Sequence, residues 1–257
     1  MITNQTILEI AMAQSGIDCG CNKEDFLKSS HVVVPSVSHP NHRKYLRLPF
    51  FCNLVSYGNN VVASVAPEFK DTAEQYINAY GVPHCFETPN LHVLQDALQP
   101  YDKKLCFMAE YFLPDVTRIL PLPCSFDLRL LSPADFSELY LPQWGNALCR
   151  ERKELDILGV GAYEQDRLVG LAACSADCET MWQIGVDVLP EYRRAGIAAA
   201  LVSRLTLEIL KRGKVPFYCA AWSNIKSVRT AIKCGFRPTW VELTAVDSAI
   251  VERFNTR

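Results

Sequence analysis

Apolar residues in the first half of the chain come in short runs that turn residues interrupt. The runs 50–57 and 61–66 flank Gly58-Asn59-Asn60, a sequence that favours a tight reversal and predicts a β-hairpin. A helical spacing follows Pro67 and stops before Gly81, so we expect a helix over 67–80. The same reasoning predicts a helix from Thr3 or Asn4 to residue 14, a second at 89–98, and strands at 31–37 and 105–113.

The second half alternates more regularly between strand-like and helix-like segments. Apolar runs predict strands at 126–131, 158–164, 168–175, 182–188 and 215–221. Helical spacing predicts an Ala/Leu-rich helix that ends near Lys211 and a short helix after Asn224. Ser132-Pro133 is typical of a helix start, so we expect a further helix to about Leu141. The whole pattern predicts a mixed α/β protein.

A proline-containing segment, Leu120-Pro121-Leu122-Pro123, separates the two halves. Two prolines at alternate positions oppose helix and hold the backbone extended, as in short connectors between domains. We therefore expect an N-terminal α/β domain of unknown role at 1–123 and a second domain at 124–257.

The charge balance of the chain removes several classes of partner. Its 257 residues carry 26 Lys and Arg against 28 Asp and Glu, a formal net charge of −2. Proteins that bind nucleic acid or anionic membranes usually carry a basic excess, so neither partner is expected. No apolar run approaches the roughly 20 residues of a membrane-spanning helix, and the first residues do not resemble a secretory signal. We expect a cytoplasmic protein.

Cysteine and histidine give weaker signals. The eleven cysteines are scattered through mostly apolar runs, which favours reduced core thiols over a disulfide framework or a metal site. All five histidines lie in the first half. Among them, His39-x-x-His42 is either a pair of ligands, a base, or a solvated pair in a polar loop.

The stretch 193–198 joins a predicted strand to a predicted helix and carries the clearest chemical signal. The first amide groups of a helix lack internal partners, and the helix dipole adds positive charge there. Gly196 allows an anion to approach the backbone, and Arg193 and Arg194 add charge. The combination predicts a cradle for a pyrophosphate, although a basic turn before a packed helix gives the same local pattern.

Two motifs in this half resemble those of the GNAT N-acetyltransferase family. Its motif A is similar to the stretch Val186-x-Val188-x-Pro190-x-x-Arg193-x-x-Gly196-x-Ala198. Its motif B is similar to Asn224-x-x-Ser227 followed by Gly235-Phe236. The resemblance implies an α+β mixed sheet with a GNAT-like acyl-CoA N-acyltransferase fold in the C-terminal half, preceded by the smaller α/β domain.

The resemblance also implies acetyl-CoA, or another acyl-CoA, as co-substrate, with direct attack of a primary amine on the thioester. The added N-terminal domain favours a small-molecule acceptor, because an extra wall narrows the site, and it equally allows a homodimer. The residues that the resemblance assigns to acyl-CoA binding are Val186, Val188, Arg193, Arg194, Ala195, Gly196, Ile197, Ala198, Asn224 and Ser227.

The catalytic groups are less well defined. Many family members place a Tyr seven residues after the motif B Asn, where this chain has Ala231. Our candidate catalytic residues are Asp187 and Glu179, although a capping or solvated-turn role explains each as simply. Tyr218 is a possible substrate contact or a buried hydroxyl with its own partner. An acyl-CoA sensor without turnover is therefore an alternative, as is a function centred on the histidines of the first half.

Overall fold

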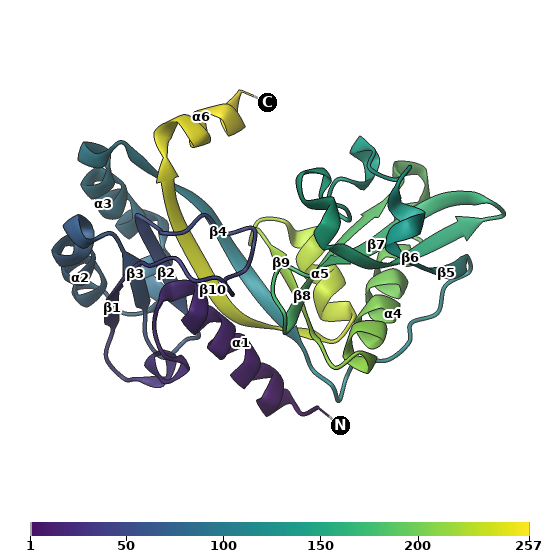
Figure 1. Ribbon diagram of the computed structural model, residues 1–257, viewed down its shortest axis with the longest axis horizontal. Helices are drawn as coiled ribbons and strands as arrows, with labels where there is room; N and C mark the ends of the chain where they lie inside the picture. Colours follow the sequence, from purple (N-terminus) through teal and green to yellow (C-terminus); the bar gives the residue numbers. More distant parts are fainter. Residues whose placement is uncertain (1, 257) are drawn as a thin grey trace. The chain divides into compact units, whose positions relative to one another are not determined.

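The structure, a computed structural model, describes residues 2–256 and contains two compact units that are interleaved along the chain. Unit 1 comprises the residues up to 10 and residues 112–238, and unit 2 comprises residues 11–111 and those from 239 on. The chain passes between the units within α1 (Asn4–Cys19), β4 (Lys103–Pro114) and β10 (Phe236–Asp247) (Figure 1). This division differs from the two consecutive domains expected from the proline segment, and the boundary at 123/124 stays a prediction.

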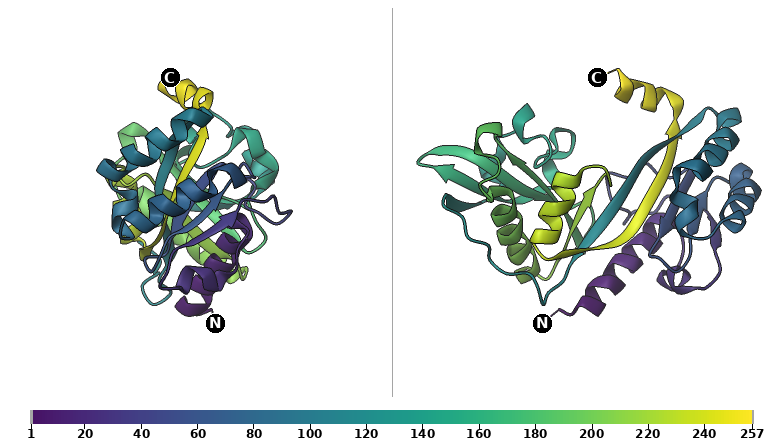
Figure 2. Two further views of the ribbon diagram at one scale, coloured as in Figure 1. Left: turned by 90° about the vertical axis from the view of Figure 1, so that its left-hand side faces the viewer. Right: turned by 180° about the vertical axis from the view of Figure 1, so that it is seen from behind.

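Unit 1 is built on a sheet with the strand order β9-β8-β7-β6-β5. Its strands are β5 (Asp127–Leu131), β6 (Asp156–Glu164), β7 (Arg167–Ser175), β8 (Met181–Val188) and β9 (Val215–Ala220). Neighbours from β5 to β8 are antiparallel, whereas β8 and β9 are parallel because helix α4 (Ile197–Lys211) crosses between them. Helix α5 (Ile225–Lys233) follows β9, and α4 and α5 lie side by side (Figure 2).

Helix α4 covers the sheet of unit 1 with its apolar face. Ile197, Leu201 and Leu205 are buried in the core that the helix shares with β6, β7 and β8. Gly170 of β7 faces the helix, and a Cβ there would lie 2.8 Å from Ile197 Cγ2 and 3.0 Å from Leu201 Cδ1. This close approach fixes the first turn of α4 beside Val188, the residue of β8 that pairs with Gly170.

Unit 2 has the strand order β1-β3-β2-β10-β4. Its other elements are β1 (Val32–Pro35), β2 (Cys52–Ser56), β3 (Val62–Val65), α2 (Lys70–Ala79), α3 (Thr88–Leu98) and α6 (Ser248–Asn255). Strands β2 and β3 form the hairpin predicted around Gly58-Asn59-Asn60. Apolar residues of α2 and α3, among them Ile77 and Leu94, pack on the sheet around Leu54.

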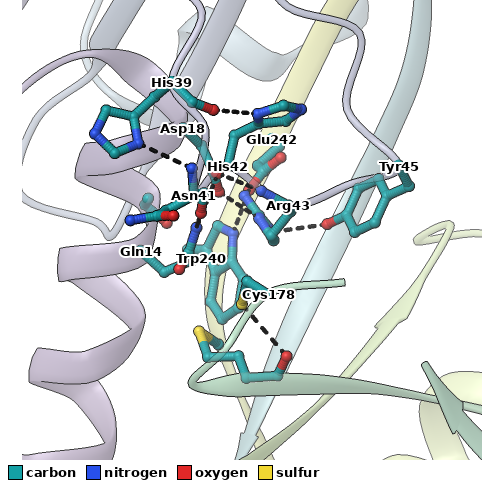
Figure 3. Close-up of polar contacts among 12 residues, drawn as sticks. Gln14, Asp18, His39, Asn41, His42, Arg43, Tyr45, Cys178, Trp240 and Glu242 are labelled. Carbon is teal, nitrogen blue, oxygen red and sulfur yellow. Dashed lines mark hydrogen bonds and ion pairs between the residues drawn. The ribbon is translucent and has the colours of Figure 1, made fainter. Parts of the chain in front are cut away.

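A fully buried arginine ties a loop of unit 2 to β10 (Figure 3). The Arg43 guanidinium forms ion pairs with Asp18 of α1 (2.5 Å) and Glu242 of β10 (2.6 Å), and it donates to the Tyr45 hydroxyl (2.7 Å). The Trp240 indole N–H also donates to Glu242, at 2.8 Å. Arg43 is 2% exposed, so these partners replace the water that its charge would otherwise require.

The end of α1 differs from the prediction. The Thr3 hydroxyl oxygen accepts from the Thr6 amide at 3.1 Å and caps the helix, as expected. The predicted end at Ser15-Gly16 is wrong, because the helix continues to Cys19 and Gly20 follows with a φ of 77°. A glycine in this left-handed conformation is the usual helix stop, and Gly16 lies inside the last turns.

The predicted helix at 132–141 is also wrong. Ser132 begins a single 3-10 turn, Pro133–Phe136, in which its amide and hydroxyl both donate to Asp135 at 2.8 Å. A second 3-10 turn follows at Pro142–Trp144. Each turn begins with a proline and buries one aromatic side chain, Phe136 in the first and Trp144 in the second. Two short turns therefore form where one helix was expected.

All eleven cysteines are free thiols. None of the helices within residues 2–256 has the length and apolar character needed to cross a membrane, and this same range contains no cluster of three or more His, Cys, Asp or Glu side chains suited to a metal ion. His39 Nδ1 accepts from the Asn41 amide at 3.1 Å and His42 Nδ1 contacts the His39 carbonyl, so both rings stabilise their own loop.

Candidate functional site

Strand β8 has a strand partner on only one side of its C-terminal half. Its pairing with β7 runs from Gln183 to Val188. Its parallel pairing with β9 runs from Met181 only as far as Ile184, which lies opposite Tyr218. Within residues 2–256, the backbone groups of 185–188 on that side have no strand partner. The Val188 carbonyl accepts from Arg193 Nε at 3.1 Å, and the other groups of this edge can pair with an extended ligand.

The loop between β8 and α4 presents backbone amides at the start of a helix. Gly196 caps α4 with a φ of 78°, and Arg194 also has a positive φ, 70°. Left-handed residues in such a loop turn successive N–H groups toward one side, a geometry that binds anions. A Cβ built on Gly196 meets no atom within 4 Å, so the space in front of the helix is open. Arg193 and Arg194 are exposed beside it.

The tip of the β6–β7 hairpin holds the turn that precedes this loop. Arg167 forms an ion pair with Glu191 at 2.7 Å, and the Tyr192 hydroxyl donates to Glu164 Oε2 at 2.5 Å. The Phe126 ring packs edge-on against Tyr192, with 5.8 Å between the ring centres. These contacts fix residues 190–192 to the sheet and position the amides that follow.

A pair of hydroxyl groups ties the start of α5 to β9. Asn224 caps α5, and its Oδ1 accepts from the Ser227 amide at 3.3 Å. Ser227 Oγ is hydrogen-bonded to the Tyr218 hydroxyl at 2.8 Å. Tyr218 is 4% exposed, and burial raises the pKa of its hydroxyl, although the bond to Ser227 opposes this shift. The two hydroxyls thus lie at the last residue pair of β8 and β9.

Position 231, where family members often carry a Tyr, is filled by the core. Ala231, a residue of α5, is fully buried in the core that contains the apolar face of α4. Cys234, one turn later, donates its thiol to the Ala199 carbonyl of α4 at 3.2 Å. A larger side chain at 231 would force the two helices apart. The arrangement leaves no space for a Tyr at this position.

The opposite face of β8 holds a loop that the sequence did not reveal. Asp187 Oδ2 accepts from the amides of Asn146 (2.8 Å) and Ala147 (2.9 Å), and its Oδ1 accepts from Asn146 Nδ2 (2.6 Å). Gly185 lies on the same face, where a Cβ would come within 1.8 Å of the Asn146 carbonyl oxygen. The Asp187 carboxylate therefore binds the loop 145–148, and the lack of a side chain at Gly185 leaves room for the loop against the strand.

The two carboxylates predicted as catalytic candidates lie at opposite ends of β8. Glu179 is exposed just before the strand begins at Met181, whereas Asp187 is its penultimate residue. A strand rises by about 3.3 Å per residue, so eight positions place the two groups too far apart to act on one reacting centre. The structure does not bring them together.

Asp156, at the start of β6, is an ionisable residue that sequence reasoning missed. It is 2% exposed, and its Oδ2 accepts from the Cys149 amide (2.9 Å) and the Tyr140 hydroxyl (3.2 Å). Burial raises the pKa of this carboxyl to about 6, while the two hydrogen bonds and Arg152 oppose the shift. Asp156 lies opposite Ser175, at the end of the sheet remote from Val188, and so outside the anion-binding loop.

A comparison with protein families identifies the segment that contains this geometry. Residues 124–240 match the family described as GNAT acetyltransferase. The matched segment includes β5 to β9, α4 and α5, with both motifs noted in the sequence. For this segment, the match confirms the predicted family. The observed elements confirm the mixed α/β fold class. No curated protein matches the sequence.

Solved structures resemble the chain at low identity. A putative GNAT-family acetyltransferase from Novosphingobium aromaticivorans is 22% identical, with 56% of this chain and 66% of that chain covered and a TM-score of 0.41. An N-acetyltransferase-like protein from Streptococcus suis is 21% identical over 60% of this chain and 68% of that chain, with a TM-score of 0.44. A Drosophila protein is 11% identical over 95% of this chain and 90% of that chain, with a TM-score of 0.47. The two bacterial matches span about two thirds of those proteins.

Proposed function

We propose, on the premise that residues 124–240 form a GNAT acetyltransferase domain, that this protein is an N-acyltransferase. A domain of this family is a transferase enzyme that takes its acyl group from acyl-CoA. The finer parts of the proposal are acetyl as the acyl group, a primary amine as the acceptor group, and a small molecule as the acceptor.

The observation that carries the proposal is the open helix start at Gly196 beside the unpaired edge of β8. The amides of 194–198 and the side chains of Arg193 and Arg194 suit the pyrophosphate of CoA. The free edge at 185–188 suits the amide groups of the pantetheine arm, which can pair with it as an added strand does. Asn224 and Ser227, at the start of α5, complete the set of groups toward this ligand.

The proposal assigns roles to the backbone of β8 and to the Asp187 side chain. Acyl-CoA, when bound, supplies an acyl group activated as a thioester. The backbone N–H groups on the unpaired side of the strand, those of Val186 and Val188, orient and polarise the acyl carbonyl. The acceptor amine must reach this carbonyl in its neutral form. Asp187 acts as a positioning residue, because its carboxylate holds the loop 145–148 on the strand that carries these N–H groups.

Calorimetric titration with acetyl-CoA and with CoA tests the proposal, and the chain offers a matched pair of glycine variants. Gly196→Glu places a charged side chain in the open space in front of α4, and we expect at least tenfold weaker binding because the carboxylate repels the pyrophosphate. Gly213 has the same kind of backbone, with a φ of 70° and no atom within 4 Å of a Cβ, but it follows the other end of α4. Gly213→Glu therefore controls for strain and charge.

Micromolar binding that Gly196→Glu loses and Gly213→Glu keeps is the expected result. No binding to the unmodified protein at millimolar ligand, or equal losses in both variants, would contradict the proposal.

The buried Ala231 favours one alternative, a protein that binds acyl-CoA without transferring the acyl group. An assay of CoA release with a panel of small amines separates the two functions. Turnover of any amine rules out the alternative, whereas tight binding with no turnover on any of them supports it.

A further inference from the structure

Aminolysis of a thioester leaves a thiolate, and rapid transfer requires a proton for its sulfur. Position 231 provides no donor in this chain, because it is a fully buried alanine. Two hydroxyl groups instead meet where β8 loses its partner strand: Tyr218 of β9 and Ser227 of α5. We propose that Tyr218 and Ser227 together donate the proton to the CoA sulfur, an inference that rests on the proposed function.

The position of Tyr218 follows from the strand register. It lies opposite Ile184, the last residue of β8 that pairs with β9, and neighbouring strands are about 4.8 Å apart. The open edge of β8 begins at the next residue, Gly185, so a thioester held there lies within reach of a tyrosine side chain from β9. The ring of Tyr218 packs against Phe236, and its hydroxyl ends at Ser227 in the first turn of α5.

The hydroxyl pair has one hydrogen more than its internal bond uses. Each hydroxyl carries one hydrogen and two acceptor lone pairs, and either oxygen can be the donor in the 2.8 Å bond. One O–H therefore bonds within the pair, and the other is free to point to a third group. Ser227 is half-buried whereas Tyr218 is almost fully enclosed, so Ser227 is the member that faces a ligand.

The charged and titratable neighbours of Tyr218 favour its protonated form. They are Cys219 on β9, Cys234 at the end of α5 and Asp187 on β8, and each raises the pKa of the Tyr218 hydroxyl, as burial does. The pair therefore keeps both protons at neutral pH.

Each proton and electron pair in the transfer has a donor and an acceptor. The amine nitrogen forms a bond to the carbonyl carbon, the C–S bond breaks, and sulfur takes the electron pair. The Ser227 hydroxyl proton passes to sulfur while the Tyr218 proton passes to Ser227 Oγ. The proton lost by the amine nitrogen returns to the Tyr218 oxygen through water.

Ligand binding alone tests this inference, without knowledge of the acceptor. A donor to the departing thiolate also hydrogen-bonds the thiolate of bound CoA, whereas acetyl-CoA has no ionisable sulfur. A free thiol ionises near pH 8.5. As the pH rises from 6.5 to 9.5, CoA should therefore gain about tenfold in affinity relative to acetyl-CoA, the gain expected of one charge-assisted hydrogen bond.

The measurement is the ratio of the two dissociation constants across this pH range, by calorimetry, for the unmodified protein and three variants. Tyr218→Phe and Ser227→Ala should lose the rise of the ratio with pH, since each breaks the donor pair. Tyr163→Phe, at a tyrosine of β6 that packs on Arg129, should keep it. Because each ratio is internal to one protein, a general loss of affinity in a variant does not alter it.

A ratio that is flat in the unmodified protein, or that rises equally in Tyr218→Phe and Ser227→Ala, would overturn the donor pair while leaving the proposed function intact. If Tyr218→Phe fails to fold, the result for Ser227→Ala decides. Absence of binding to either ligand in the unmodified protein would overturn the proposed function and this inference with it.

Discussion

The functional residues of this chain differ in whether the local sequence predicts their roles. Gly196, Arg193 and Arg194 are consecutive or nearly so, and their spacing alone predicts an anion site. Asp187 and Asn146 are 41 positions apart, and their contact depends on how β8 meets a loop that has no regular pattern. Sequence reasoning therefore located the loop before α4 but could not show that Asp187 holds another loop.

Asp156 provides a prediction about pH at the scale of one residue. Its folded-state pKa of about 6 lies above the value near 3.9 of an unfolded Asp, so the folded state binds the proton more tightly. This group therefore stabilises the fold below about pH 4, and its contribution is lost as the pH rises to about 6. At pH 8 the ionised carboxylate therefore leaves the fold about 3 kcal/mol less stable than it is with the protonated group at low pH.

Asp156→Asn removes this titration while it keeps an oxygen to accept from Cys149 and Tyr140. We expect the variant to be more stable than the unmodified protein at pH 8 and to lose that advantage at pH 4. Urea denaturation at both pH values gives the difference in free energy of unfolding. A difference that does not change with pH would show that Asp156 titrates normally.

At the scale of elements, the two faces of β8 contact different parts of the chain. Val186 and Val188 pack toward the core under α4, while Gly185 and Asp187 receive the loop 145–148. The alternation of a strand was predictable from the apolar pattern. The loop was not, because the sequence before it favoured a helix at 132–141 and gave two short turns instead.

Gly185→Ala tests the seat of this loop. The new Cβ would lie 1.8 Å from the Asn146 carbonyl oxygen, so the backbone of the loop must move and its bonds to Asp187 must lengthen. We expect a loss of about 1–3 kcal/mol in the free energy of unfolding, as in other overpacked sites. Gly81→Ala is the control, since its Cβ would meet only His84 Nδ1, at 3.7 Å. Equal stability of the two variants would mean that the loop adapts freely.

The whole molecule is organised by pairings between distant parts of the chain. The proline segment at 120–123 suggested two consecutive domains, yet unit 2 combines residues 11–111 with those from 239 on. Arg43 and Glu242 are 199 positions apart, and no local pattern indicates that they form an ion pair. Hydrophobic periodicity identifies strands, but it carries no information about which distant strand each one pairs with.

Arg43→Met tests how much of unit 2 depends on this pairing. The substitution leaves Asp18 and Glu242 buried without their common cation, and we expect a loss of at least about 3 kcal/mol in the free energy of unfolding. Lys104→Met removes an exposed ion pair with Glu252 and should cost less than about 1 kcal/mol. Chemical denaturation of both variants measures the two effects. Similar small losses in the two variants would show that water reaches the Arg43 cluster.

The interleaved units also impose an order on synthesis. A ribosome delivers residues 11–111 early, but β2 must wait for its partner β10, which lies at 236–247. Until then Arg43 has no Glu242, and the edge of β2 that later pairs with β10 stays exposed to other nascent chains. Unit 1 ends at residue 238, so its whole sequence is made before the last segment of unit 2. The part of the nascent chain with an unpaired strand edge is thus the part made first, not the part made last.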